Sequence, residues 1–225
     1  VIQLSDDDLP MRFRKLADLH SSVISPNGKW VGGYYSVGDE SAGALFYIVF
    51  INLETDERIE LGPYPESLVF LTSVVCMTDT GILYGIEANG GIKVFDVNEK
   101  DYYVLEVPGM NTAAIGISNI SADGSFWVGW DQVDGYYRPF VVENGTATML
   151  PLPEENFRGP YEDGEINLMA RGFSEDHSII YGTTWDNKDF GMIYWDADRN
   201  VHFVGEDVRK VTTIQRPDGY GGTYD

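Results

Sequence analysis

Hydrophobic and polar positions along the chain follow one pattern that occurs four times. Each occurrence has a short apolar strand, then Ser or Thr in a polar turn, and then a hydrophobic run that ends in glycine. The four segments span residues 23–33, 74–85, 117–129 and 171–182. Short apolar runs bounded by turn residues indicate β-strands. The pattern therefore predicts four related units built of strands.

The polar turns explain why the pattern recurs. Their hydroxyl residues are Ser25, Thr78, Ser121 and Ser174. These positions lie 53, 43 and 53 residues apart, and repeats of roughly 40 to 50 residues are typical of β-propeller blades. Asn27-Gly28 and Asp123-Gly124 accept the positive φ that a tight hairpin needs, whereas the fourth unit must place Asp176 or His177 there. The glycines that end the hydrophobic runs indicate a close backbone approach or a bulge; they are Gly33, Gly85, Gly129 and Gly182.

Each unit continues with two more strand candidates. The third strands are expected at 44–52, 92–97, 139–143 and 192–196, and the outer strands at 58–61, 102–107, 147–150 and 201–204. Four strands per repeat predict an all-β fold, a β-propeller of about four four-stranded antiparallel blades. The blades are expected at approximately 20–63, 70–108, 113–152 and 168–206. An N-terminal segment, 1–19, precedes them, with a helical turn or two at most in 9–18.

The number of blades in the ring stays open at this point. Residues 210–214 resemble one more inner strand, and Arg216-Pro217-Asp218-Gly219 resembles the turns of the other units. Residues 210–225 are therefore expected to start a further blade or to supply a closing strand. An open array exposes a sheet face and favours association. We therefore favour part of a larger propeller, or an oligomer, over a closed ring of four.

Two groups of known repeats resemble these units. The segment 114–117 and the later Arg138-Pro139-Phe140 run, 138–145, resemble the bacterial extracellular HAF repeat. The first unit, 24–29, is similar to TolB-type, WD-like propeller repeats. The resemblance covers about 20–206 and implies a secreted or periplasmic bacterial propeller. It implies no catalytic residue.

Composition and charge limit the function. Hydrophobic residues make up 43% of the 225 residues, and the net charge is −21. Such an acidic surface repels nucleic-acid phosphates and anionic membranes, so neither is expected as a partner. The longest apolar run, 44–51, is too short to span a bilayer.

The sequence contains few groups suited to catalysis. Cys76 is the single cysteine, and no His lies at a metal-ligand spacing from another ligand. The Gly-x-Ser-x-Gly elbow and the phosphate-binding loop are absent from the sequence. We therefore expect no cofactor and no transition-metal site, and favour a protein that is not an enzyme. A catalytic carboxylate pair remains open, because the separation of two carboxylates cannot be obtained from sequence.

One set of candidate ligand-binding residues follows from propeller topology. Loops between second and third strands lie on the same face as the crossovers between blades. In the third unit this region contains Trp130, Asp131, Tyr136 and Tyr137, and in the fourth Trp185 and Asp186; the long crossover at 153–165 adds Arg158 and Tyr161. Aromatic rings beside hydrogen-bonding groups suit sugar or peptide ligands. The alternative is that Trp130 and Trp185 cap the blade cores.

Three functions are weighed on these grounds. The favoured one is a non-enzymatic, extracytoplasmic binding module whose loop face holds a glycan, a peptide or a protein partner. The alternatives are a propeller hydrolase or the propeller of a larger enzyme, and a structural scaffold. Self-association through unpaired blades is a further expectation.

Overall fold

The computed structural model describes residues 19–38, 43–153, 167–184 and 192–203 in full, together with the backbone of four two-residue strands. Those strands are β13 (Glu155–Asn156), β14 (Gly159–Pro160), β19 (Ile214–Gln215) and β20 (Thr223–Tyr224). All regular secondary structure in these residues is β. The helical turn expected in 9–18 lies outside the described residues.

The remaining strands form four antiparallel sheets of four strands each. Blade 1 contains β1 (Ser21–Ile24), β2 (Trp30–Val37), β3 (Leu45–Asn52) and β4 (Arg58–Pro65). Blade 2 contains β5 (Leu71–Met77), β6 (Ile82–Glu87), β7 (Ile92–Asp96) and β8 (Asp101–Val104). Blade 3 contains β9 (Gly116–Ile120), β10 (Phe126–Val133), β11 (Tyr136–Glu143) and β12 (Thr146–Met149). Blade 4 contains β15 (Leu168–Phe173), β16 (Ile180–Thr184), β17 (Met192–Trp195) and β18 (Val201–Phe203). Strands that are neighbours in the chain are neighbours in each sheet, so every blade is a meander and the predicted fold class is confirmed.

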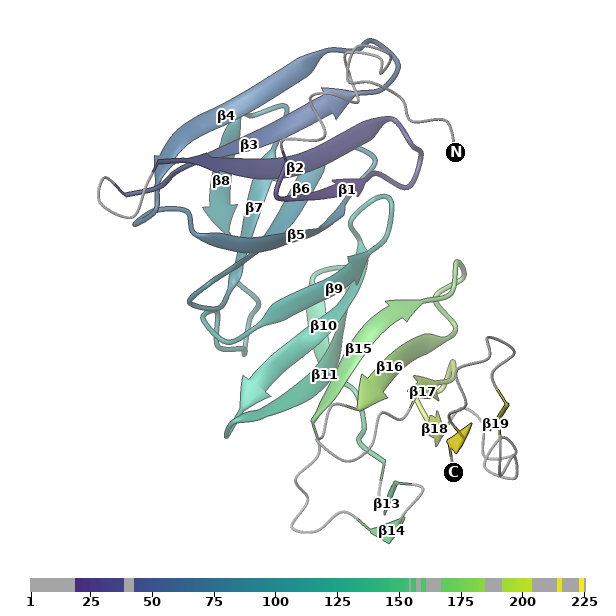
Figure 1. Ribbon diagram of the computed structural model, residues 1–225. Helices are drawn as coiled ribbons and strands as arrows, with labels where there is room; N and C mark the ends of the chain where they lie inside the picture. The colour runs from purple at the N-terminus through teal and green to yellow at the C-terminus, as the bar shows by residue number, and fades with distance from the viewer. Residues whose placement is uncertain are drawn as a thin grey trace.

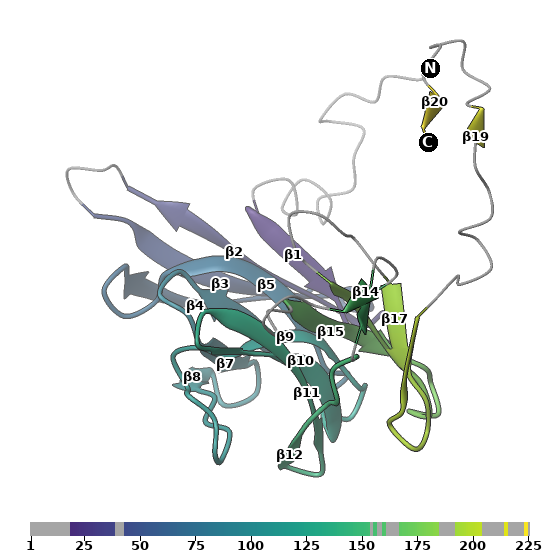
Figure 2. The ribbon, with the colours of Figure 1, turned by 90° about the horizontal axis from the view of Figure 1, so that it is seen from below.

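The first strands of successive blades lie next to one another. β1 contacts β5, β5 contacts β9, and β9 contacts β15. Figure 1 shows the four sheets following one another from blade 1 to blade 4, and Figure 2 shows the same succession from below. No comparable contact joins β15 to β1 among the described strands. The described blades therefore form an open arc.

Apolar side chains fill the space between successive sheets. Phe50 and Phe95 are fully buried between blades 1 and 2, Phe140 is buried between blades 2 and 3, and Trp195 between blades 3 and 4. Burying one side chain of this kind contributes about 1.5–3 kcal/mol. Sheet-to-sheet packing is therefore a large contribution to the stability of the described blades.

In the first hairpin of each blade, the turn hydroxyl accepts a hydrogen bond from a backbone N four or five residues later. In blade 1, Ser25 Oγ accepts from the backbone N of Trp30 at 2.9 Å, and Gly28 has φ 72°. Ser121 accepts from Phe126 N and Ser174 from Ile179 N, each at 3.0 Å, and Thr78 accepts from Ile82 N at 3.1 Å. In the fourth turn His177 itself takes the left-handed conformation, with φ 59°. The equivalence of the four turn hydroxyls is confirmed.

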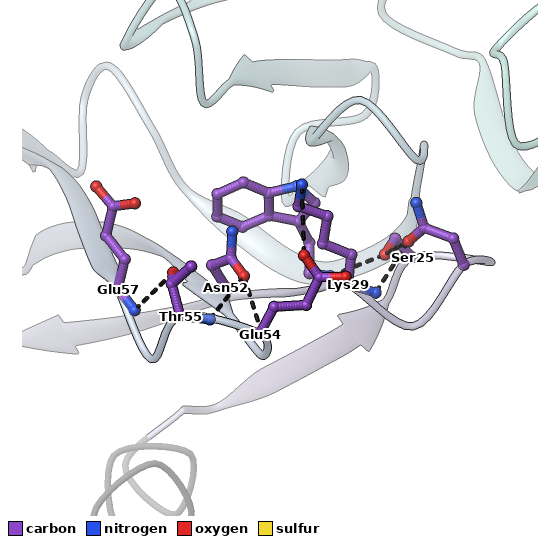
Figure 3. A network of polar contacts seen from close by, with 8 residues as sticks. Ser25, Lys29, Asn52, Glu54, Thr55 and Glu57 are labelled. Carbon is purple, nitrogen blue, oxygen red and sulfur yellow. Dashed lines mark hydrogen bonds and ion pairs between the residues drawn. The ribbon is translucent and has the colours of Figure 1, made fainter.

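A second turn lies beside the first hairpin at the same end of blade 1. Asn52 Oδ1 accepts from the backbone N of Glu54 at 2.9 Å and of Thr55 at 3.2 Å, which closes the β3–β4 turn. Leu53 N donates to Lys29 O at 2.7 Å, and Lys29 Nζ lies 3.7 Å from Glu54 Oε2. Figure 3 shows these two turns side by side.

The turns are also joined from blade to blade. Asn27 N donates to Asp79 Oδ1 at 2.8 Å, and Asp79 N donates to Ala122 O at 2.8 Å. The His177 ring stacks on Phe126 of blade 3, with centroids 4.1 Å apart. Consecutive blades are thus held both through their apolar faces and through their turns.

Acid is expected to weaken these turns. Hydrogen bonds, first from Ser121 and then from Ser125, lower the pKa of Asp123 to about 2, and bonds from Ser174 and Ser178 do the same for Asp176. Because an unfolded Asp has a pKa of about 3.9, the stability from these carboxylates is complete above that pH and is lost as pH falls towards 2. The double variant Asp123→Asn/Asp176→Asn should therefore lose less stability between pH 7 and pH 3 than the parent chain, measured by urea unfolding.

Blade 1 provides the reason why asparagine should preserve the turn. Asn27 Oδ1 already accepts from Ser25 Oγ at 2.8 Å and from Lys29 N at 2.9 Å. A double variant as acid-sensitive as the parent would show that other carboxyl groups control acid unfolding.

Candidate functional site

Three of the four inner strands contain a residue that skips the ladder with the neighbouring strand. The pairing passes from Val74 to Cys76 in blade 2, from Ile117 to Asn119 in blade 3, and from Ala170 to Gly172 in blade 4. The skipped residues are Val75, Ser118 and Arg171. Each stands three positions before the turn hydroxyl of its blade. A bulge bends its strand and re-aims a side chain, so equivalent bulges give these three side chains a common placement.

Glycines of the second strands stand at these bulges. Gly129 pairs with Ile117, and a Cβ at Gly129 would lie 2.0 Å from the backbone O of Gly116. Gly182 pairs with Ala170, and a Cβ there would lie 2.6 Å from Met169 O. The expectation of close backbone approach or a bulge at these glycines is confirmed.

The three bulge residues line one hollow of about 330 Å³. Blade 2 contributes β5 and β6, blade 3 contributes β9 and β10, and blade 4 contributes β15. The full lining is Ser73, Val75, Ile86, Ile117, Ser118, Trp130, Met169 and Arg171. We call this space the axial hollow, because inner strands of three successive blades form most of its wall.

The axial hollow combines a charge, an aromatic ring and an apolar wall. Arg171 Nε donates to Thr183 Oγ1 at 3.1 Å. The buried Ser118 Oγ has no hydrogen-bond partner within the described residues. The ring of Trp130 is half-buried and lies against Gly116, where a Cβ would come within 2.2 Å of it. Tyr137 supports Trp130 edge-on, with centroids 4.9 Å apart.

Two of the four described members of the predicted site lie at this hollow, Trp130 and the Tyr137 ring that contacts it, and none of the four lies in a loop. Trp130 lines the hollow, and Asp131 is buried in β10 with one carboxylate oxygen unpartnered in the described part of the chain. Tyr136 and Tyr137 begin β11; the Arg138 guanidinium lies 5.2 Å from the Tyr136 ring, and Tyr137 N donates to Asn167 Oδ1 at 2.9 Å.

Their placement in a loop was wrong. The connection is only Asp134-Gly135, with φ 53° and 87°. A two-residue turn with both φ positive matches the twist of the strands, so β10 and β11 continue up to it.

The other predicted members, Arg158, Tyr161, Trp185 and Asp186, lie outside the described residues. Sequence reasoning missed Ser73, Ser118, Met169 and Arg171. The sequence contained a signal for two of these residues, Ser118 and Arg171. Each stands three positions before a turn hydroxyl, and the glycine on the neighbouring strand was expected to mark a close approach or a bulge.

Two other candidate features of the described residues, a second hollow and the single cysteine, are less suited to binding or catalysis. A second hollow of about 300 Å³ lies at the turn end of blades 3 and 4, where Arg199 pairs with Glu143 and donates to His177 O. Burial raises the pKa of the Cys76 thiol well above its usual range, which disfavours a reactive thiolate.

The described residues contain no cluster of three metal-binding side chains. Their structure contains no helix that is long and apolar enough to cross a membrane.

Comparisons with known proteins support the fold. No family model matches the chain, and no curated protein matches its sequence. The crystal structure of TolB from Acinetobacter baumannii is 15% identical with a TM-score of 0.54, and the match covers 82% of this chain and 42% of that one. A Bacteroides ovatus protein described as a dipeptidyl aminopeptidase IV is 12% identical with a TM-score of 0.53, and the match covers 80% and 32%. This chain thus spans less than half of either structure. The four sheets, their order and these similarities together show that the chain has a β-propeller fold, with each sheet forming one blade.

Proposed function

We propose that the chain is a non-enzymatic binding module whose axial hollow holds an acidic segment of a peptide or protein partner. The observation that carries the proposal is the convergence of three equivalent bulges, one of them Arg171, on a single hollow. In the proposed complex the guanidinium of Arg171 binds a carboxylate, and Trp130 contacts an adjacent apolar group.

The charge of the lining favours a carboxylate. Of the side chains that line the hollow, Arg171 alone is charged in the part of the chain that the structure describes. Its described hydrogen bond uses Nε, which leaves the terminal NH₂ groups for a ligand. Guanidinium groups bind carboxylates through two parallel hydrogen bonds, which fix orientation as well as charge.

The overall charge of the chain opposes such a ligand only at long range. The net charge is −21, but charges separated by more than about 8 Å are largely screened at physiological salt. Contact with Arg171 therefore decides whether a carboxylate binds.

The size of the hollow favours a short segment. Its volume of about 330 Å³ is at the lower end of ligand pockets, which run from roughly 300 to 1,000 Å³. A few side chains of an extended peptide fill such a space. An extracytoplasmic location is part of the proposal and rests on the resemblance of the repeats to extracellular and periplasmic propellers.

The test begins with a displayed library of short peptides that carry free carboxyl termini. We expect selection for Asp, Glu or the terminal carboxylate next to an apolar residue. Changing Arg171→Gln should weaken binding of the selected peptides about tenfold or more in calorimetry, because a hydrogen bond to a charged group contributes about 1.5–3 kcal/mol.

The control is Arg58→Gln, which makes the same charge change on blade 1, where Arg58 pairs with Glu60. This control should leave affinity within about twofold, a difference well below the 1.4 kcal/mol that corresponds to a factor of ten. An equal loss of affinity in both variants would overturn the proposal. So would equal binding of two forms of a peptide without Asp or Glu, one with a free C-terminal carboxylate and one with a C-terminal amide. Peptides should be recovered intact by mass spectrometry, whereas cleavage would support the hydrolase alternative.

A further inference from the structure

One sheet face of the arc is exposed where its equivalents are buried. In blades 2 and 3, Tyr84 and Val128 pack against the next blade and are 7% and 0% exposed. The equivalent residue of blade 4 is Tyr181, which is 41% exposed. In blades 1, 3 and 4 this position lies seven residues after the turn hydroxyl.

The neighbouring strand shows the same difference. Ile92 is 1% exposed in blade 2, and Met192, which has the same place in β17, is 53% exposed. Ile179, Tyr181, Met192 and Tyr194 together form what we call the outward face of blade 4. Because equivalent positions of two other blades are buried by the blade that follows them, this face continues the established series of blade–blade interfaces.

The opposite end of the arc is covered where a partner blade would dock. Val31, Val49 and Ile51 form a buried cluster on the side of blade 1 that faces away from blade 2, with Leu19, Tyr35 and Leu53 packed against it. A second copy could not place its blade 1 on the outward face of blade 4 without first uncovering this cluster. Head-to-tail association is therefore disfavoured, and the occupant must come from elsewhere.

The chain itself contains a suitable segment. Strands β19 and β20 pair antiparallel, Ile214 with Tyr224 and Gln215 with Thr223, around Arg216-Pro217-Asp218-Gly219. The Pro-Asp-Gly of this turn resembles Pro26-Asn27-Gly28 between β1 and β2, although the connection from Gln215 to Thr223 is one residue longer than that from Ile24 to Val31. Among the described strands the main contacts of β19 and β20 are with each other.

We propose that residues 210–225 form the first hairpin of a fifth blade and that this hairpin packs on the outward face of blade 4. The inner strand would lie beside β15, as β5 lies beside β1 and β9 beside β5. The proposal is independent of ligand binding in the axial hollow.

The first experiment places a cysteine pair in the full chain, Tyr181→Cys with Gln215→Cys. The positions correspond to Gly32 and Met77, where a Cβ on Gly32 would lie 2.3 Å from Met77 Cε, so the two positions face one another across the blade interface. Mild oxidation should give an intramolecular disulfide, identified by mass spectrometry of the linked peptides. Cys76 is buried and should remain unmodified. The control pair joins Tyr181→Cys with Ser5→Cys. A disulfide-linked dimer would point to a second copy and overturn the proposal, as would equal cross-linking of the control pair.

A second experiment needs no engineered contact. Tyr181 and Val133 are both 41% exposed in the structure. If the hairpin covers the outward face, a bulky maleimide should modify the Tyr181→Cys thiol about tenfold more slowly than the Val133→Cys thiol, because modification then requires local opening. Equal rates in the two folded variants would show that the face is open to solvent and would overturn the proposal.

Discussion

Replacing Gly129 by alanine is expected to lower the free energy of unfolding by about 3 kcal/mol or more, the upper part of the range for overpacked sites. The added Cβ would lie 2.0 Å from Gly116 O and 3.3 Å from Ile117 Cα. Both are backbone atoms of the neighbouring strand, so a side-chain rotation cannot relieve the contact. The strand β9 would have to move away from β10, which would open the ladder beside the bulge at Ser118. Urea unfolding at neutral pH measures the loss.

The matched control is Gly145→Ala in the same blade. Gly145 has φ 77°, and a Cβ there would meet no atom within 4 Å. That substitution tests conformational strain alone and should cost about 1 kcal/mol. If Gly129→Ala costs no more than Gly145→Ala, the close approach of β9 and β10 is not a fixed feature of the blade.

Replacing Trp195 by alanine is expected to cost about 3–5 kcal/mol, the range for a large buried aromatic side chain. Trp195 is completely buried in the cluster between blades 3 and 4. Its indole Nε1 also donates to Pro151 O at 2.8 Å, which ties blade 4 to the start of the crossover. The alanine variant loses the packing and the hydrogen bond together. Thermal or urea unfolding of the full chain measures the sum.

The variant Trp195→Phe separates the two contributions. It keeps most of the apolar contact but removes the hydrogen bond to Pro151 O, and a typical intramolecular hydrogen bond contributes about 0.5–1.5 kcal/mol. We expect the phenylalanine variant to lie between the parent and the alanine variant. A phenylalanine variant as unstable as the alanine variant would show that the hydrogen bond, and not the packing, is the main contribution.

Most of the fold could be predicted because the turns carry strong local information. A hydroxyl such as Ser25, followed by Asn27 and Gly28, specifies a hairpin through bonds made within a few residues. Repetition of that local rule at intervals typical of propellers predicts the blades. The strand limits were less accurate where pairing decided them. β4 continues to Pro65, beyond the expected 58–61, because β3 and β4 pair again after the register shift between Phe46 and Ile48.

The site was harder to predict for a similar reason. A bulge arises from the register between two strands, and the sequence pattern does not contain that register. Arg171 therefore stood in an expected inner strand without a specified direction. Trp130 and Tyr137 were chosen for their chemistry and do lie together, but the two-residue turn after Val133 places them in strands rather than in a loop.

The bulges separate the chemistry of the axial hollow from the pairing of the strands. A bulge residue does not pair in the ladder between β5 and β6, or in the equivalent ladders of blades 3 and 4. The chain accordingly has an aliphatic, a hydroxylated and a cationic side chain at equivalent positions, in blades that otherwise fold alike: Val75, Ser118 and Arg171. Changes at these three positions alter the chemistry of the hollow while the turns, the glycines and the apolar faces stay the same. Ser118 and Arg171 are the freer of the three sites, because Val75 also packs against the core between blades 2 and 3.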